Sequence, residues 1–87
     1  MLALTLYSRP GCHLCDDMKA VVKAVVARVS RGRAEPIAME EVDISTDAAL
    51  EERYGLDIPV LMLNGRKIAK YRITEAELTR ALDARQL

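Results

Sequence analysis

Aromatic residues are scarce in this chain of 87 residues, which contains no Trp, no Phe and three Tyr. The core must therefore be built from aliphatic side chains, and so few rings cannot form the stacking platform with which proteins bind single-stranded nucleic acids. An excess of either charge is also missing, because thirteen basic residues balance thirteen acidic ones. Nucleic-acid-binding domains usually carry a basic excess or a basic face. We therefore expect no nucleic acid among the partners of this protein.

Long apolar segments are missing too. No run reaches the roughly 18 apolar residues that suggest a membrane span, and Met1–Tyr7 lacks the positive start and the long apolar stretch of a secretory leader. We therefore expect a cytoplasmic protein without membrane contact, in a compartment that keeps thiols reduced. The chain is also too short for two independent cores, so residues 1–87 should form a single domain. We expect that domain to be a monomer.

Signals for strands and helices alternate along the chain. Aliphatic runs bounded by Gly, Pro or Asn predict strands at Ala3–Tyr7, Pro36–Ile44, Val60–Leu63 and Arg66–Tyr71. Helices are expected from Leu14 to an end near Gly32, over Asp47–Arg53 with Ser45 as N-cap, and after Thr74 through about Arg85. In the first of these helices, apolar residues that should face the core recur at helical spacing: Leu14, Met18, Val21, Val25 and Val29.

Short motifs indicate how these elements connect. Asn64-Gly65 is a strong hairpin signal, so the last two strands should be antiparallel neighbours. Thr74 and Glu77 form a capping box at the start of the last helix. The first two strands are joined through a helix and should be parallel. We therefore predict an α/β fold in the order β-α-β-α-β-β-α. Its four-stranded mixed sheet should have the three helices spread over both faces and the polar second and last strands at its edges.

The residues that carry chemistry are Cys12 and Cys15, at the junction of the first strand and the first helix. A thiolate at a helix N-terminus faces unpaired N–H groups and the positive end of the helix dipole, which lower the pKa of a thiol. Arg9 in the same loop, and His13 when it is protonated, add positive charge. The spacing puts Cys15 one turn into the helix, so Cys12 is the candidate nucleophile and Cys15 the more buried resolving thiol. Such a pair attacks a disulfide, forms a mixed disulfide and then resolves it internally.

Other roles are open to two cysteines at this spacing. Inert core thiols conflict with the neighbouring Gly11 and with the loop position. A structural zinc site within one chain needs four ligands, and only His13, Asp16 and Asp17 lie near the cysteines, so we expect no metal there. Two alternatives remain on the same fold. One is a carrier of a metal or iron–sulfur cluster shared between two chains, and the other is a redox-sensing binding module that acts without turnover.

The segment Tyr7–Cys15 resembles the active site of glutaredoxins, which run Tyr-Ser, a basic residue, two further residues and then Cys-Pro-Tyr-Cys. Val42-Asp43-Ile44 resembles their second strand, and Tyr54-Gly55 with Ile58-Pro59-Val60 resembles the segment that leads to their cis-proline. The likeness is to the small glutaredoxin-like proteins of bacteria, within the thioredoxin superfamily. It implies a thioredoxin-like fold in which Pro59 is cis and lies beside the two cysteines.

The resemblance also implies residues that bind substrate. In glutaredoxins the backbone before the cis-proline pairs with the bound thiol substrate, which makes Ile58 and Pro59 candidates here. Arg9 and His13 are further candidates because of their positive charge near Cys12. Glutaredoxins also have a Gly-Gly pair and an acidic residue after the last strand, which hold glutathione. This chain has the segment 69–75 there, without a Gly. We therefore expect glutathione to be a poor co-substrate.

The motif and the resemblance together predict a glutaredoxin-like thiol-disulfide oxidoreductase. Its substrates should be disulfides of proteins or of low-molecular-weight compounds, and its electrons should come from a reductase or from glutathione. We expect no resident cofactor.

Overall fold

The computed structural model describes residues 2–33 and 36–84. Its elements follow in the order β1 (Leu2–Ser8), α1 (His13–Ser30), β2 (Ile37–Asp43), the 3-10 turn η1 (Ile44–Thr46), α2 (Ala48–Tyr54), β3 (Val60–Leu63), β4 (Arg66–Lys70) and α3 (Glu75–Ala84). This is the predicted order of strands and helices, with boundaries that differ by at most two residues. The predicted end of the last helix at Arg85 lies outside the described residues.

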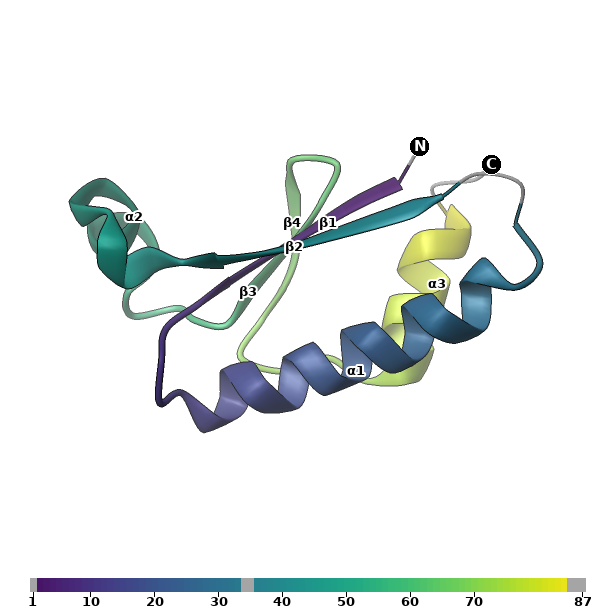
Figure 1. Ribbon diagram of the computed structural model, residues 1–87, viewed down its shortest axis with the longest axis horizontal. Coiled ribbons are helices and arrows are strands. Elements are labelled where there is room, and N and C mark those ends of the chain that lie inside the picture. The colour runs from purple at the N-terminus through teal and green to yellow at the C-terminus, as the bar shows by residue number, and fades with distance from the viewer. Residues whose placement is uncertain (1, 34–35, 85–87) are drawn as a thin grey trace.

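The four strands form one mixed sheet in the order β2-β1-β3-β4 (Figure 1). β1 runs parallel to β2 and antiparallel to β3. β3 and β4 form an antiparallel hairpin whose turn residues Asn64 and Gly65 both have positive φ, at 51° and 82°. That geometry is the turn for which an Asn-Gly pair is suited. The α/β fold with a four-stranded mixed sheet and three helices is therefore confirmed, with polar β2 and β4 at the edges.

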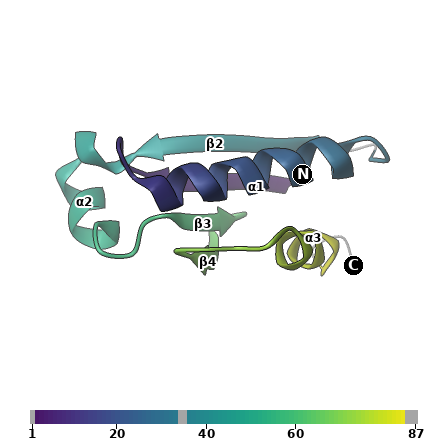
Figure 2. The same ribbon diagram turned by 90° about the horizontal axis from the view of Figure 1, so that it is seen from below.

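One face of the sheet carries the core. Side chains alternate along β1, so Leu2, Leu4 and Leu6 point to the same face and are almost fully buried. Helices α1 and α3 both cover this face, as Figures 1 and 2 show. They complete an entirely aliphatic cluster with buried residues that include Met18, Val22, Val25, Leu78 and Leu82.

The opposite face departs from the prediction that helices cover both sides. Helix α2 lies at the end of the sheet beside the carboxyl end of β2 and has no buried residue (Figure 1). Its contribution to this face is Tyr54, whose ring stacks on Tyr7 of β1 with the centroids 4.4 Å apart. With only seven residues, α2 is too short to span the sheet.

The buried stripe of α1 is also shifted from the predicted one. The fully buried residues are Cys15, Met18, Val22 and Val25, whereas Leu14 is 36% exposed and Val21 is half-buried. The helix carries two neighbouring apolar stripes, and packing against β1 and α3 turns the one with Cys15 inward.

The capping residues agree with the sequence at one helix and differ at another. At α3 the predicted box is present, because the Thr74 N–H donates to Glu77 Oε1 and the Glu77 N–H donates to Thr74 Oγ1, each at 3.0 Å. At α2 the N-cap is Asp47 and not Ser45, since Asp47 Oδ1 accepts from the backbone of Ala49 at 2.9 Å. Ser45 lies within the preceding 3-10 turn, where its own N–H donates to Asp43.

Candidate active site

Cys12 and Cys15 form a disulfide in this structure, with their Cα atoms 5.2 Å apart. Cys12 is the N-cap of α1, and its Sγ accepts a hydrogen bond from the backbone N–H of Cys15 at 3.1 Å. The two sulfurs differ in surroundings, because Cys12 is half-buried whereas Cys15 is only 2% exposed. Negative charge on the Cys12 sulfur would face the free N–H groups of the helix start. This arrangement favours Cys12 as the group that meets a substrate.

The loop that presents Cys12 is a tight turn after β1. The Cys12 N–H donates to the Arg9 carbonyl at 3.3 Å, and Gly11 has a φ of 82°. A positive φ is costly for residues with a Cβ, so the turn explains why glycine precedes Cys12. The turn and the helix start together place half-buried Cys12 at the junction of β1 and α1.

Pro59 and Ile58 lie in the loop that enters β3. The Ile58–Pro59 peptide bond is cis. The next residue, Val60, pairs with Tyr7 near the end of β1, from which the cysteine loop departs. The topology therefore brings the loop before β3 and the cysteine loop to the same end of the sheet. Pro59 is buried and its carbonyl accepts from the Tyr71 N–H at 2.8 Å, while Ile58 is half-buried.

Arg9 and His13 take different positions around the disulfide. The Arg9 guanidinium donates to the Gly55 carbonyl at 2.8 Å and pairs with Glu51 at 3.3 Å. Arg9 therefore ties the cysteine loop to the end of α2, which leads directly into the loop before Pro59. His13 is the first residue of α1 and is exposed. The six residues proposed from the sequence thus gather at one end of the sheet, with Arg9 connecting its two loops.

A pocket of about 260 Å³, open to solvent, lies beside Cys15. It is lined by Ser8, Arg9, Pro10, Cys15, Asp16, Glu41 and Asp43. The Glu41 carboxylate accepts from Ser8 Oγ at 3.0 Å and pairs with Lys19 Nζ at 2.8 Å. The hydrogen bond from Lys19, more than that from Ser8, holds the pKa of Glu41 below its usual value of 4.5. Buried Cys15 therefore lines the same pocket as an ionised, hydrogen-bonded carboxylate.

Reasoning from the sequence did not single out Glu41, because an acidic residue in an edge strand is ordinary. The feature that places Glu41 near Cys15 is the register between β1 and β2. Glu41 pairs with Leu6, so it faces α1 with the core residues and not the opposite side of the sheet. A pairing register between strands cannot be deduced from local pattern alone.

Metal-binding clusters and membrane-spanning helices are both absent from the described residues. Among residues 2–33 and 36–84, no cluster of three His, Cys, Asp or Glu side chains is placed to hold a metal ion. Within the same residues, no helix combines the length and apolar character needed to cross a membrane.

Known proteins resemble this chain in sequence and in fold. The "Glutaredoxin-like protein YDR286C homolog" of Dictyostelium discoideum is 27% identical over 75 residues, which cover 86% of this chain and 69% of that protein. The X-ray structure of target protein XcR50 from X. campestris is 38% identical and superposes with a TM-score of 0.73, over 93% of this chain and 96% of that one. Protein Ne2328 from Nitrosomonas europaea, at 22% identity and a TM-score of 0.71, covers 92% of this chain and 89% of its own, and it supports the fold alone.

The family comparison covers almost the whole sequence. The model of the Glutaredoxin-like domain (DUF836) matches residues 3–83, which include both cysteines, Ile58 and Pro59. The resemblance drawn from the cysteine segment is thereby confirmed, and so is the thioredoxin-like fold. This chain belongs to the Glutaredoxin-like domain (DUF836) family.

Proposed function

We propose that this protein is a cytoplasmic thiol-disulfide oxidoreductase that reduces disulfides of proteins or of low-molecular-weight compounds. The observation that carries the proposal is the disulfide between Cys12, half-buried at the helix start, and Cys15, buried one turn further. A structural staple needs no such asymmetry, whereas thiol-disulfide exchange needs one accessible attacking sulfur and one internal resolving sulfur.

The reaction begins with the reduced pair of cysteines. The Cys12 thiolate attacks one sulfur of the substrate disulfide, so a bond forms between Cys12 Sγ and that sulfur while the substrate S–S bond breaks. The departing substrate thiolate takes up a proton. Cys15 then loses its proton and attacks Cys12 Sγ, which forms the Cys12–Cys15 disulfide and releases the second substrate thiol. Two electrons pass to the substrate, and the protein ends in the disulfide state found in this structure.

The groups around the disulfide have supporting roles in this proposal. Ile58 and Pro59 bind the substrate backbone next to Cys12, as an extended segment added to the loop that enters β3. Arg9 holds the two loops together through Gly55, and exposed His13 lies at the rim where substrate approaches. Regeneration of the dithiol requires a partner that supplies two electrons, which is a reductase or glutathione.

The test is a single-turnover reaction that needs no external electron donor. The reduced protein is mixed with a disulfide-linked peptide dimer, and the release of peptide thiol is followed. Wild type should release two peptide thiols for each Cys12–Cys15 disulfide formed. Cys12→Ser should release none, and Cys15→Ser should release one and retain the other peptide on Cys12.

The matched pair of cysteine variants makes the outcome decisive. Equal loss in both variants without any trapped peptide would contradict the division of roles. Failure of the wild type to reduce the peptide, together with colour and bound metal in protein purified without oxygen, would favour the cluster-carrier alternative.

A further inference from the structure

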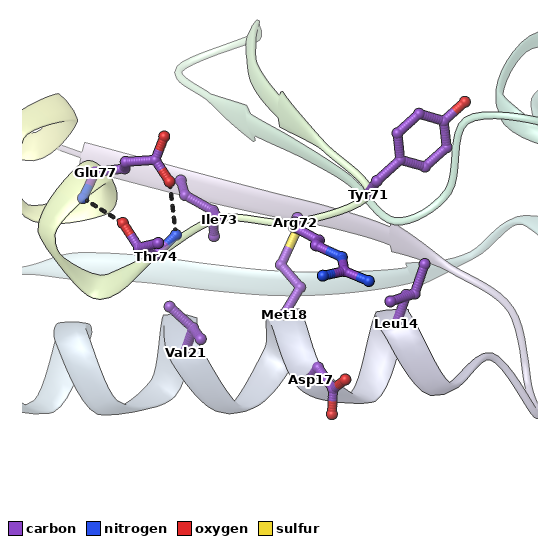
Figure 3. Close-up of a pocket in the computed structure, with 9 residues that line it drawn as sticks. All are labelled: Leu14, Asp17, Met18, Val21, Tyr71, Arg72, Ile73, Thr74 and Glu77. Atoms are coloured by element: carbon purple, nitrogen blue, oxygen red, sulfur yellow. Dashed lines mark hydrogen bonds between the residues drawn. The ribbon is translucent and has the colours of Figure 1, made fainter.

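A groove of about 320 Å³ lies between α1 and the segment that joins β4 to α3 (Figure 3). It is lined by Leu14, Asp17, Met18, Val21, Tyr71, Arg72, Ile73, Thr74 and Glu77. Figure 3 shows Leu14, Met18 and Val21 pointing from α1 toward this segment.

The groove is largely apolar and starts next to the disulfide. Leu14 lies between the two cysteines in sequence and is 36% exposed. Across from it, Tyr71 is 41% exposed. Within residues 2–33 and 36–84, the only other exposed large hydrophobic residue is Leu56, at 94%. Exposed apolar residues are therefore concentrated around the reactive end of the molecule, which is where a binding surface is expected.

One wall of the groove is attached to the loop before Pro59. The Tyr71 N–H donates to the Pro59 carbonyl at 2.8 Å, and the Tyr71 hydroxyl donates to the Leu56 carbonyl at 3.1 Å. Tyr71 has a φ of 70°, which turns the chain sharply out of β4 toward α3. The wall is thereby held at the same end of the sheet as Ile58 and Cys12. A substrate bound at Cys12 is next to the mouth of the groove.

The charges at the rim are mainly negative. Asp17 and Glu77 contribute two carboxylates, and Arg72 contributes one cation. Hydrogen bonds from the Thr74 backbone and side chain hold the pKa of Glu77 below its usual value, so its carboxylate stays ionised at neutral pH. This balance disfavours an acidic ligand. Glutathione has two carboxylates and no large apolar side chain, so it suits neither the apolar lining of the groove nor its mainly negative charges.

We propose that this groove binds a large apolar side chain of a protein substrate, close in sequence to the cysteine that Cys12 attacks. The inference rests on the proposed redox function. Leu14 and Val21 are seven residues apart on α1, which corresponds to a groove length of about 10 Å. An extended chain advances about 3.3 Å per residue, so the apolar side chain lies within about three residues of the substrate cysteine. The substrate class is thus a protein disulfide flanked by Leu, Ile, Met or Phe.

The test compares disulfide-linked peptide dimers in the single-turnover reaction. Each peptide has one cysteine in a Gly/Ser background, and each of the three positions on either side of it carries in turn Leu, Ser or Glu. We expect at least one position at which Leu raises the second-order rate constant about tenfold over Ser, equivalent to about 1.4 kcal/mol. Glu at that position should give a rate below that of Ser, because of Asp17 and Glu77.

Two variants separate the groove from the rest of the surface. Val21→Trp fills the groove and should abolish the preference for Leu, so that the ratio of the Leu to the Ser rate constant falls to about 1. Ala27→Trp, on the exposed side of the same helix, is the matched control and should keep the preference. Asp17→Lys changes an exposed residue and does not depend on packing, so it also serves if Val21→Trp fails to fold. It should raise the rate of the Glu peptide several-fold relative to the Ser peptide.

The outcomes distinguish the two proposals. Equal rates for Leu, Ser and Glu at every position would overturn the groove assignment and leave the redox function intact. A preference for Leu that persists in Val21→Trp, or a Glu peptide unaffected by Asp17→Lys, would also overturn it. Failure of all peptides to react would instead contradict the proposed function itself.

Discussion

The reactive end of the molecule and the contact between α1 and α3 differ in how their apolar side chains are used. At the reactive end, which comprises the cysteine loop, the loop before Pro59 and Tyr71, the large side chains of Leu14 and Leu56 remain exposed. At the opposite end, α1 packs against α3, where Leu78 and Leu82 are fully buried. Arg28 adds polar contacts between α1 and α3 at the surface. Its guanidinium pairs with Glu75 at 3.0 Å and donates to Thr79 at 2.8 Å.

The comparison indicates that the two regions serve different purposes. Apolar area at the α3 end is removed from water and stabilises the fold, whereas part of the apolar area at the reactive end, on Leu14, Leu56 and Tyr71, stays exposed and is available to a partner. The helix start that favours negative charge on Cys12 belongs to the reactive end. The experiments below test whether stability and reactivity separate in this way.

The largest expected effect is on stability at the α3 end. Leu82→Ala removes a fully buried side chain and should lower the free energy of unfolding by about 2–5 kcal/mol. Leu56→Ala, at a residue that is 94% exposed, should change it by less than about 0.5 kcal/mol. Urea denaturation of the oxidised proteins measures both values. A similar loss in the two variants would break the comparison.

The next largest effect is the difference in alkylation rate between Cys12 and Cys15. In the reduced protein, Cys12 should be alkylated on the order of a hundredfold faster than Cys15, because reaching Cys15 requires local opening that costs a few kcal/mol. The pH at which alkylation of Cys12 is half-maximal should lie below that of a free cysteine, about 8.5. Mass spectrometry after pulsed labelling measures both quantities. Faster labelling of Cys15 would reverse the assigned roles.

Leu82→Ala supplies a control for the labelling experiment. At low denaturant the variant should keep the same ratio of labelling rates, provided that it remains folded. If the ratio collapsed while the protein stayed folded, reactivity at Cys12 would depend on the α3 contact, and the two ends would not be independent.

The smallest effect is the pH dependence contributed by Glu41 beside Cys15. Its folded pKa is lowered, chiefly by the hydrogen bond from Lys19, so its contribution to stability is present above the usual value of 4.5 and is lost as the pH falls through the folded pKa. The pKa of Lys19 is raised by the same contact, so its contribution is present below 10.5 and is lost as the pH rises through the folded value.

The variant Glu41→Gln isolates this contribution. The stability difference between wild type and variant should be constant between about pH 5.5 and pH 9.5 and should shrink below about pH 4. Urea denaturation at several pH values measures it, and Glu40→Gln, at an exposed neighbour on the other face of β2, is the control. A difference that grew in acid would contradict the assigned sign.

The sequence by itself determined the features that depend on neighbours along the chain. The order of strands and helices, the Asn64-Gly65 turn and the capping box of Thr74 and Glu77 could be predicted because their signals lie within a few residues. The position of Cys12 at the start of a helix followed in the same way, and with it the chemistry of the candidate site.

Only the tertiary structure decided which of these residues meet. The outward turn of Leu14 depends on how α1 packs against β1 and α3, and the contact between Glu41 and Ser8 depends on the register of two strands. The hydrogen bond from Tyr71 to Leu56 joins segments 15 residues apart. Local patterns do not encode such contacts, because each is selected by the packing free energy of the whole domain and not by the propensity of its own segment.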